Sequence, residues 1–346
     1  MEKLISFQKQ DLAKITSLRS GEIKFGEKII TIPADANVKS FLKNADAKYV
    51  LFGIPEDIGV RANFGRPGAA SAWESALKSI VNIQHNRFCK GDDLIILGQL
   101  DVAEEMKLVE TLDFQNTQDR KLLSDLVSKI DKEVVHIIST IINAGKKPII
   151  IGGGHNNAYG NIKGTALAKG SPINAINFDA HSDFRILEGR HSGNGFSYAF
   201  EECFLGKYFI FGLHENYTSK KVLNTIKKNK DRVRYNTYDD IAIRKIKNFE
   251  KEMSLAFEFI KEEPYGIEID LDALPNIATS AMTPSGFSVE EVRQFICFFG
   301  KNRNASYLHI CEGAPELGDE KNSHLVGKLI GYLVTDFMKA NLKTEE

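Results

Sequence analysis

The 346-residue sequence has few cysteines, no excess of one charge and no long hydrophobic run. Its cysteines (Cys89, Cys203, Cys297 and Cys311) are scattered without a CxxC pair, which is typical of proteins from a reducing compartment. The 45 basic and 46 acidic residues give a formal net charge of −1, so nothing indicates a nucleic-acid partner. No apolar window approaches the length of about eighteen residues that a membrane span needs, and the N-terminus lacks a signal-peptide core. The sequence therefore predicts a cytoplasmic protein.

Short apolar runs alternate along the chain with amphipathic helical patterns. We expect strands at 48–54, 93–97, 147–151, 173–178, 208–212, 233–238, 266–271 and 305–311. Helices are predicted at 118–143, 219–230, 247–262, 288–300 and 324–341. Strands that are apolar on both faces and separated by helices indicate an α/β fold with a mainly parallel sheet of about eight strands, covered on both sides.

No repeat or linker divides the sequence. We expect residues 46–346 to form a single domain. Residues 1–45 are less regular in pattern, and we expect them to form an N-terminal embellishment of that domain. Association with further copies of the chain is left open.

Polar residues of one chemical kind follow the predicted strands, where ligands bind in open parallel sheets. They are His155, then Asp179, His181 and Asp183, then Asp270 and Asp272, and finally Glu312. In extended chain, side chains at alternate positions point to one face, so each group can converge on one point.

Four carboxylates and two imidazoles balance the charge of two divalent cations. This mixed oxygen and nitrogen set favours Mn²⁺, with Fe²⁺, Co²⁺ or Ni²⁺ as alternatives, over iron–sulfur or structural zinc. Two such ions about 3.5–4 Å apart can activate a water molecule near neutral pH. A lone Asp-x-Asp is commonly a solvated turn, but these residues flank apolar runs, where an unpaired carboxylate is costly. A metal site is therefore the better interpretation.

Three segments, GGGH (152–155), NFDAHSD (177–183) and EIDLD (268–272), resemble in order the signature blocks of the arginase–agmatinase–formimidoylglutamase superfamily. The likeness covers about residues 48–315 and implies an arginase-like, three-layer fold. It also implies a ligand set for each of two Mn²⁺ ions. One set is His155, Asp179, Asp183 and Asp270, and the other is Asp179, His181, Asp270 and Asp272.

The resemblance also assigns roles in catalysis. Glu312, in CEGAP, matches the family glutamate that grips amidine or guanidine nitrogens, and a buried carboxylate suits such a planar cation. Asp183 matches the family's proton-handling aspartate. Together these matches imply a metal-dependent hydrolase acting on a small molecule with a C=N carbon.

Several departures favour formimidoylglutamase within the superfamily. Phe196 stands where arginases and agmatinases carry a proton-shuttling histidine. The segments GGGHNNAYG and GVRANFGRPGAA (59–70) resemble formimidoylglutamase patterns, although Leu274 replaces the usual aspartate before Pro275. The expected reaction is N-formimidoyl-L-glutamate plus water to L-glutamate and formamide.

This substrate carries two carboxylates, which bidentate arginines hold well. Arg61 and Arg66 are the candidates, and a surface salt bridge is the alternative for each. Ser192 and Asn194 are candidates for the α-carboxylate, but Ser-Gly-Asn is also ordinary turn chemistry. His191 could replace the missing histidine or simply be a loop residue.

Other functions share most of these features. An arginase or guanidinobutyrase-like ureohydrolase would use the same metals on a guanidine and release urea, but Phe196 counts against arginase. A deacetylase of similar fold would need a different histidine pair, which the sequence lacks. A catalytically inactive metal-binding homologue would keep the six ligands without needing Glu312.

Overall fold

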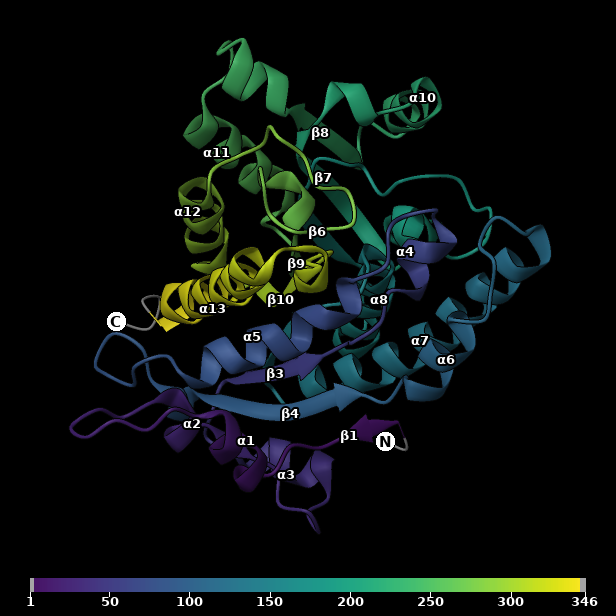
Figure 1. Ribbon diagram of the computed structural model, residues 1–346. Coiled ribbons are helices and arrows are strands. Elements are labelled where there is room, and N and C mark those ends of the chain that lie inside the picture. The colour runs from purple at the N-terminus through teal and green to yellow at the C-terminus, as the bar shows by residue number, and fades with distance from the viewer. Residues whose placement is uncertain (1–2, 343–346) are drawn as a thin grey trace.

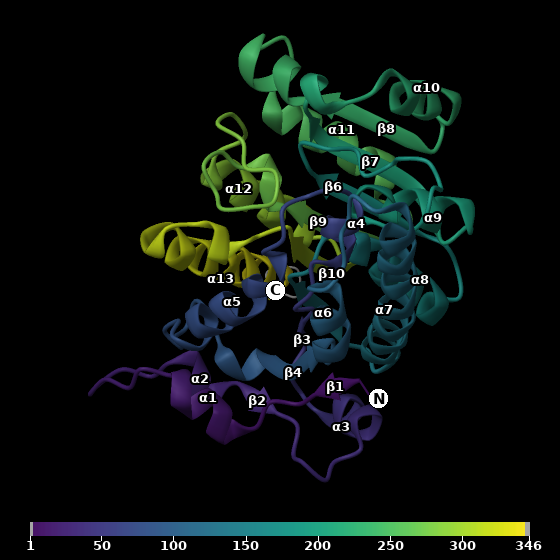
Figure 2. The same ribbon diagram turned by 45° about the vertical axis from the view of Figure 1, so that its right-hand side comes forward.

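The protein forms a ten-stranded sheet between two layers of helices (Figures 1 and 2). A computed structural model describes residues 3–342. The strands are β1 Leu4–Ile5, β2 Ile30–Thr31, β3 Tyr49–Gly53, β4 Leu94–Leu100, β5 Lys147–Ile151, β6 Ile173–Phe178, β7 Leu205–Leu213, β8 Val233–Thr237, β9 Tyr265–Asp270 and β10 Ala305–Cys311. Their order is β1-β4-β3-β5-β10-β9-β6-β7-β8, with β2 also beside β4. The strands pair in parallel except for β1, which runs antiparallel to β4.

Helices cover both faces of this sheet. They are α1 Lys9–Ile15, α2 Phe25–Lys28, α3 Val38–Asn44, α4 Ile58–Ala62, α5 Ala72–Val81, α6 Ala103–Val109, α7 Thr117–Asn143, α8 Ala158–Lys169, α9 Gly195–Glu201, α10 Lys220–Lys228, α11 Phe249–Ile260, α12 Val289–Gly300 and α13 Glu320–Leu342. One core lies between the sheet and α5, α11, α12 and α13, and the other lies against α7, α8, α9 and α10. Side chains of β3 alternate between them, Leu51 in the first core and Phe52 in the second. The predicted three-layer α/β fold is confirmed.

All eight predicted strands form, and two short strands add to them. β1 and β2 come from residues 1–45 and pair with β4 on the side away from β3, and β1 lies below β4 in Figure 1. β4 also continues past its predicted end to Leu100. Gly98 explains this difference, because it has φ 127° beside a register shift, and a Cβ there would lie 2.0 Å from the Ile5 carbonyl oxygen. A glycine at this point therefore lets β4 continue while β1 passes close to it.

The sheet order brings together the strands that carry the predicted site. β5, β10, β9 and β6 are neighbours and run parallel, so their carboxyl ends meet at one edge. In such sheets this edge is where ligands bind. Within residues 3–342, no helix is both long and apolar enough to cross a membrane.

Candidate metal centre

His155 faces three carboxylates through one ring nitrogen. Its Nδ1 lies 2.9 Å from Asp183 Oδ2, 3.2 Å from Asp270 Oδ2 and 3.3 Å from Asp179 Oδ2. The four side chains are buried. Their ligand atoms lie within 4.8 Å of one another, close enough to hold one ion. This is the first ligand set that the resemblance implies.

A second group gathers around His181. The ligand atoms of His181, Asp270 and Asp272 lie within 4.8 Å of one another. His181 Nδ1 is 3.6 Å from Asp179 Oδ1 and 3.8 Å from Asp272 Oδ2. Asp179 thus presents one oxygen to each histidine, and Asp270 belongs to both groups. These two aspartates are the ones placed to bridge a pair of ions.

The buried carboxylates of the cluster repel one another, and bound cations would relieve this repulsion. Burial, and then the charge of Asp179, raises the pKa of Asp183. Burial and the charges of Asp179 and Asp272 raise the pKa of Asp270 well above its ordinary value. Burial also raises the pKa of Asp272. Buried like charges at this spacing are costly unless a cation compensates them. Carboxylate oxygens with two imidazole nitrogens fit divalent transition metals.

Two residues of the site have left-handed backbone. Asp183 has φ 43° and Glu312 has φ 62°, a region that residues other than glycine rarely adopt. Such strain is typical of functional sites, where the surrounding structure holds it in place. Between β5 and His155, glycines adopt the same left-handed conformation, since Gly152 has φ 87° and Gly153 has φ 73°. They turn the chain sharply between β5 and His155.

Glu312 lies beside the cluster with both oxygens hydrogen-bonded. It accepts from the His155 backbone N–H at 2.8 Å and from the Ser280 hydroxyl at 2.7 Å. Burial, and then the charge of Asp272, raises the pKa of Glu312 to about 8. A planar cation above this carboxylate would offset that cost.

A cavity of about 790 Å³ opens over these residues. His181, Asp183, Asp270, Asp272 and Glu312 line it. Asn63, Arg185, Ser192 and Lys221 also belong to its wall. The cavity therefore joins the carboxylate cluster to polar and cationic side chains that a small anionic substrate could use.

The structure places Arg61 and Arg66 outside this cavity wall. Arg61 Nε donates to Asp57 at 2.7 Å, and Asp57 also accepts from the Gly68 N–H. The exposed Arg66 donates to the carbonyl oxygens of Thr279 and Ser280. Both guanidinium groups fasten the loop after β3, so this geometry does not support the predicted carboxylate contacts.

The two other residues predicted to contact the substrate, Ser192 and Asn194, lie in the loop between β6 and α9 but in different surroundings. Ser192 lines the cavity and accepts from Asn63 Nδ2 at 3.1 Å. Asn194 is fully buried inside the loop, where its side-chain oxygen accepts from Arg190 at 2.8 Å and its amide donates to the Gly189 carbonyl. Ser192 is therefore available to a substrate, whereas Asn194 shapes the loop.

Phe196 and His191 are both packed within the protein. Phe196 stacks on Tyr208 with ring centroids 4.3 Å apart and meets the His155 ring edge-on at 5.1 Å. His191 accepts from the Gly193 N–H through Nδ1. Burial, and then the charge of Arg185, lowers the pKa of His191 to about 4, so the ring is neutral near pH 7.

Sequence reasoning missed two arginines of this loop. Arg185 comes two residues after Asp183 and lines the cavity, and that closeness in sequence was the available signal. Arg190 is buried and makes a bidentate pair with Asp131 of α7, at 2.8 and 3.1 Å. Nothing local in the sequence links Arg190 to a helix 59 residues away.

Known proteins are similar to this chain in sequence and in fold. The sequence is 24% identical over 260 residues to the formimidoylglutamase of Chromobacterium violaceum, covering 73% of this chain and 75% of that protein. The crystal structure of formimidoylglutamase from Bacillus subtilis superposes with a TM-score of 0.74 at 17% identity, covering 95% of both chains. The Trypanosoma cruzi formiminoglutamase with Mn²⁺ superposes with a TM-score of 0.70 at 18% identity, over 92% of this chain and 99% of that one. Residues 47–335 match the Arginase family, and the chain therefore belongs to that family.

Proposed function

We propose that the protein is a manganese-dependent hydrolase that converts N-formimidoyl-L-glutamate and water to L-glutamate and formamide. One observation carries the proposal: a single cavity joins the buried carboxylate cluster, the Glu312 carboxylate and the Arg185 guanidinium. This combination matches a substrate that is an amidine at one end and anionic at the other. The formimidoylglutamase of Chromobacterium violaceum, similar over three quarters of its length, supports the same substrate.

Six side chains of the cluster would hold two Mn²⁺ ions, with Asp179 and Asp270 shared. They are His155, Asp179, His181, Asp183, Asp270 and Asp272. When bound, the ions supply an activated water and stabilise negative charge that develops on the reacting carbon's substituents. The Mn²⁺-bound Trypanosoma cruzi structure of the same fold supports this choice of metal.

Residues of the chain handle orientation and protons. Glu312, held by the His155 N–H and Ser280, hydrogen-bonds the formimidoyl nitrogens and orients the carbon toward the cluster. Asp183 lines the cavity and passes the proton taken from water to the departing glutamate nitrogen. Phe196 leaves no imidazole at the position where a histidine would do this.

Arg185 is the cavity cation best placed to bind a substrate carboxylate. Its Nη1 donates to Asn63 Oδ1 at 2.8 Å and its Nη2 to Glu188 at 2.6 Å, so the guanidinium is held in one orientation beside Ser192. We assign the substrate's carboxylate contacts to Arg185 and Ser192 in place of Arg61, Arg66 and Asn194. A cytoplasmic location stays a prediction.

Replacing Arg185 tests this assignment. Arg185→Met should raise KM for formimidoylglutamate about tenfold, because a hydrogen bond to a charged group contributes about 1.5–3 kcal/mol and solvent screens this side chain, which is 46% exposed. Steady-state kinetics with Mn²⁺-loaded protein measures it. Arg66→Met is the matched control and should leave KM within about twofold. A large rise for Arg66→Met and none for Arg185→Met would return the role to the loop after β3.

A further inference from the structure

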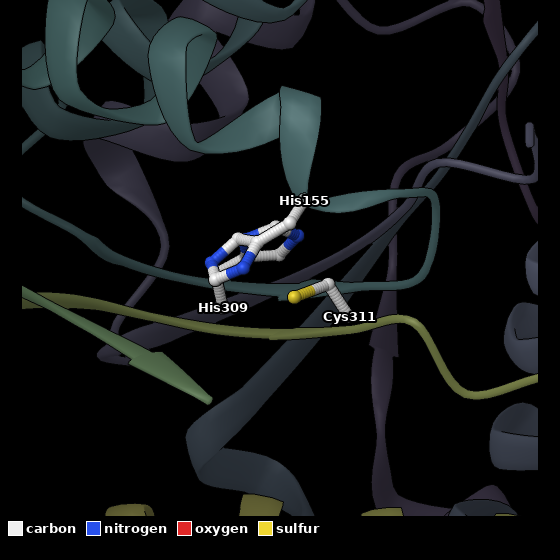
Figure 3. Close-up of side chains that lie close together, drawn as sticks. All are labelled: His155, His309 and Cys311. Atoms are coloured by element: carbon white, nitrogen blue, oxygen red, sulfur yellow. The ribbon is translucent and has the colours of Figure 1, made fainter. Parts of the chain in front are cut away.

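Behind His155, on the side away from the carboxylate cluster, lies a second buried polar network. It consists of Glu268 on β9 with Tyr307 and His309 on β10. Glu268 and His309 are neighbours in the β9–β10 pairing, and all three side chains are fully buried. Figure 3 shows the His155 and His309 rings close together, with the Cys311 sulfur beside them.

The two nitrogens of the His155 ring face different partners. Nδ1 points to the cluster of Asp179, Asp183 and Asp270. Nε2 is buried without a hydrogen bond among the described residues, and Glu268 Oε2 lies 3.5 Å from it. A neutral imidazole binds a metal through the nitrogen that lacks the proton, so Nδ1 can be a ligand only if Nε2 carries it.

Glu268 is itself fixed by donors on the neighbouring strand. Tyr307 Oη donates to Oε1 at 2.6 Å, and His309 Nδ1 lies 2.5 Å from Oε2. His309 Nε2 in turn faces the Gly152 carbonyl at 3.3 Å, which ties the network to the loop before His155. Gly266 makes room for it, because a Cβ there would lie 2.1 Å from the Tyr307 ring.

His155, His309 and Cys311 do not form a third metal site. The ligand atoms of His155, His309 and Cys311 lie within 4.8 Å of one another. However, both nitrogens of His309 face partners within hydrogen-bond distance, and the Cys311 thiol faces the Ile269 carbonyl at 3.5 Å. Burial also raises the pKa of the Cys311 thiol well above its ordinary value, which disfavours the thiolate that binds metals.

We propose that Glu268, held by His309 and Tyr307, is a positioning residue that keeps the proton of His155 on Nε2 and turns Nδ1 toward the ion. The inference rests on the two-ion centre of the proposed function. Glu268 should affect the binding of one ion more than that of the other, because His155 belongs to only one of the two ligand sets. A carboxylate behind a metal-binding histidine typically raises metal affinity about 10–100-fold.

Glu268→Gln is the direct test. The side chain keeps its size, but one acceptor oxygen becomes an NH₂ donor. Tyr307 and His309 compete for the remaining oxygen, so the amide is left facing His155 Nε2 and favours the wrong tautomer. Calorimetric titration of the metal-free full chain with Mn²⁺ should show one of two binding steps weakened about 10–100-fold and the other within about threefold. Tyr307→Phe, which removes one donor and leaves the Glu268 charge, should weaken the same step less.

Asp336→Asn is the matched control for loss of a buried carboxylate. Asp336 is buried on α13 and pairs with Arg293 and Lys339, outside the metal cluster. The control should lower the thermal midpoint of the metal-free protein and leave both binding steps unchanged. Two unchanged steps in Glu268→Gln, or an equal loss in both, would overturn the inference while leaving the proposed centre standing. Wild-type protein that takes up no Mn²⁺ would remove the centre and the inference together.

Discussion

Asp179 offers its two carboxylate oxygens to different histidines, whereas Asp272 lies near His181 alone. Asp179→Asn should therefore weaken both bound ions, because the amide lacks the charge and second acceptor that a bridge needs. Asp272→Asn should weaken one ion and leave the other largely in place. Elemental analysis after gel filtration in Mn²⁺ measures this. Equal metal loss from both variants would contradict the bridging assignment.

His191 gives a prediction in pH, because burial lowers its pKa from 6.5 to about 4. Between these values the unfolded chain binds a proton at His191 that the folded protein does not, so the contribution of His191 to folding stability falls as pH drops from about 6.5 toward 4. His191→Asn keeps a side-chain acceptor for the Gly193 N–H but cannot titrate. Thermal midpoints at pH 7.5 and pH 5 should therefore differ less in the variant. An identical acid loss in both proteins would show that His191 does not contribute to it.

For single residues, the sequence predicted the positions of side chains that lie directly at strand ends. Asp179, Asp183 and Asp270 follow strands whose apolar runs are plain, and alternation along the chain set their direction. The roles of Arg61 and Arg66 as substrate contacts stay predictions, and the structure places both outside the cavity wall because a long side chain reaches several ångströms from its backbone. Its partner, here Asp57 for Arg61, depends on packing that spacing does not encode.

Among the elements, the loop between β6 and α9 is held to α7 through Arg190. Arg190 forms a bidentate pair with Asp131 and donates to the Asn156 carbonyl at 2.8 Å, next to His155. Arg190 thereby connects three segments of the chain. They are the loop between β6 and α9, the segment after β5 that carries His155, and helix α7.

Removing that contact should affect stability and substrate binding together. Asp131→Ala leaves the Arg190 charge buried and unpaired, which typically costs about 3–5 kcal/mol. Chemical denaturation should show this loss, and KM should rise because Ser192 and Arg185 belong to the freed loop. Lys78→Ala, which removes one exposed i,i+4 pair with Glu74, is a surface control that should change stability by less than about 0.5 kcal/mol. An Asp131→Ala protein as stable as this control would contradict the account.

The helices and strands with strong periodicity were predictable, and the short ones were not. The apolar pattern of α7 spans about seven turns. It predicted a helix at 118–143, and the observed helix, Thr117–Asn143, differs by one residue. β1 and β2 have two residues each and exist only because β4 offers an unpaired edge. Such pairing is a tertiary effect that local sequence cannot show.

For the whole molecule, the order of strands creates the site. β5 and β6 carry the first two ligand groups but are not neighbours, since β9 and β10, from much later in the chain, lie between them. Sequence patterns predicted which strand ends carry ligands, and the resemblance to a known family implied that they meet. Strand order itself follows from long-range packing of the two cores.

The most direct test of the central claim is to measure products from several substrates with Mn²⁺-loaded protein. N-formimidoyl-L-glutamate, L-arginine and agmatine are supplied at equal concentration, and formamide and urea are quantified by chromatography. The account predicts formamide release well above any urea release, abolished by chelation and restored by Mn²⁺, because the cavity pairs an amidine-binding carboxylate with Arg185. Urea formed from arginine or agmatine faster than formamide from formimidoylglutamate would contradict it.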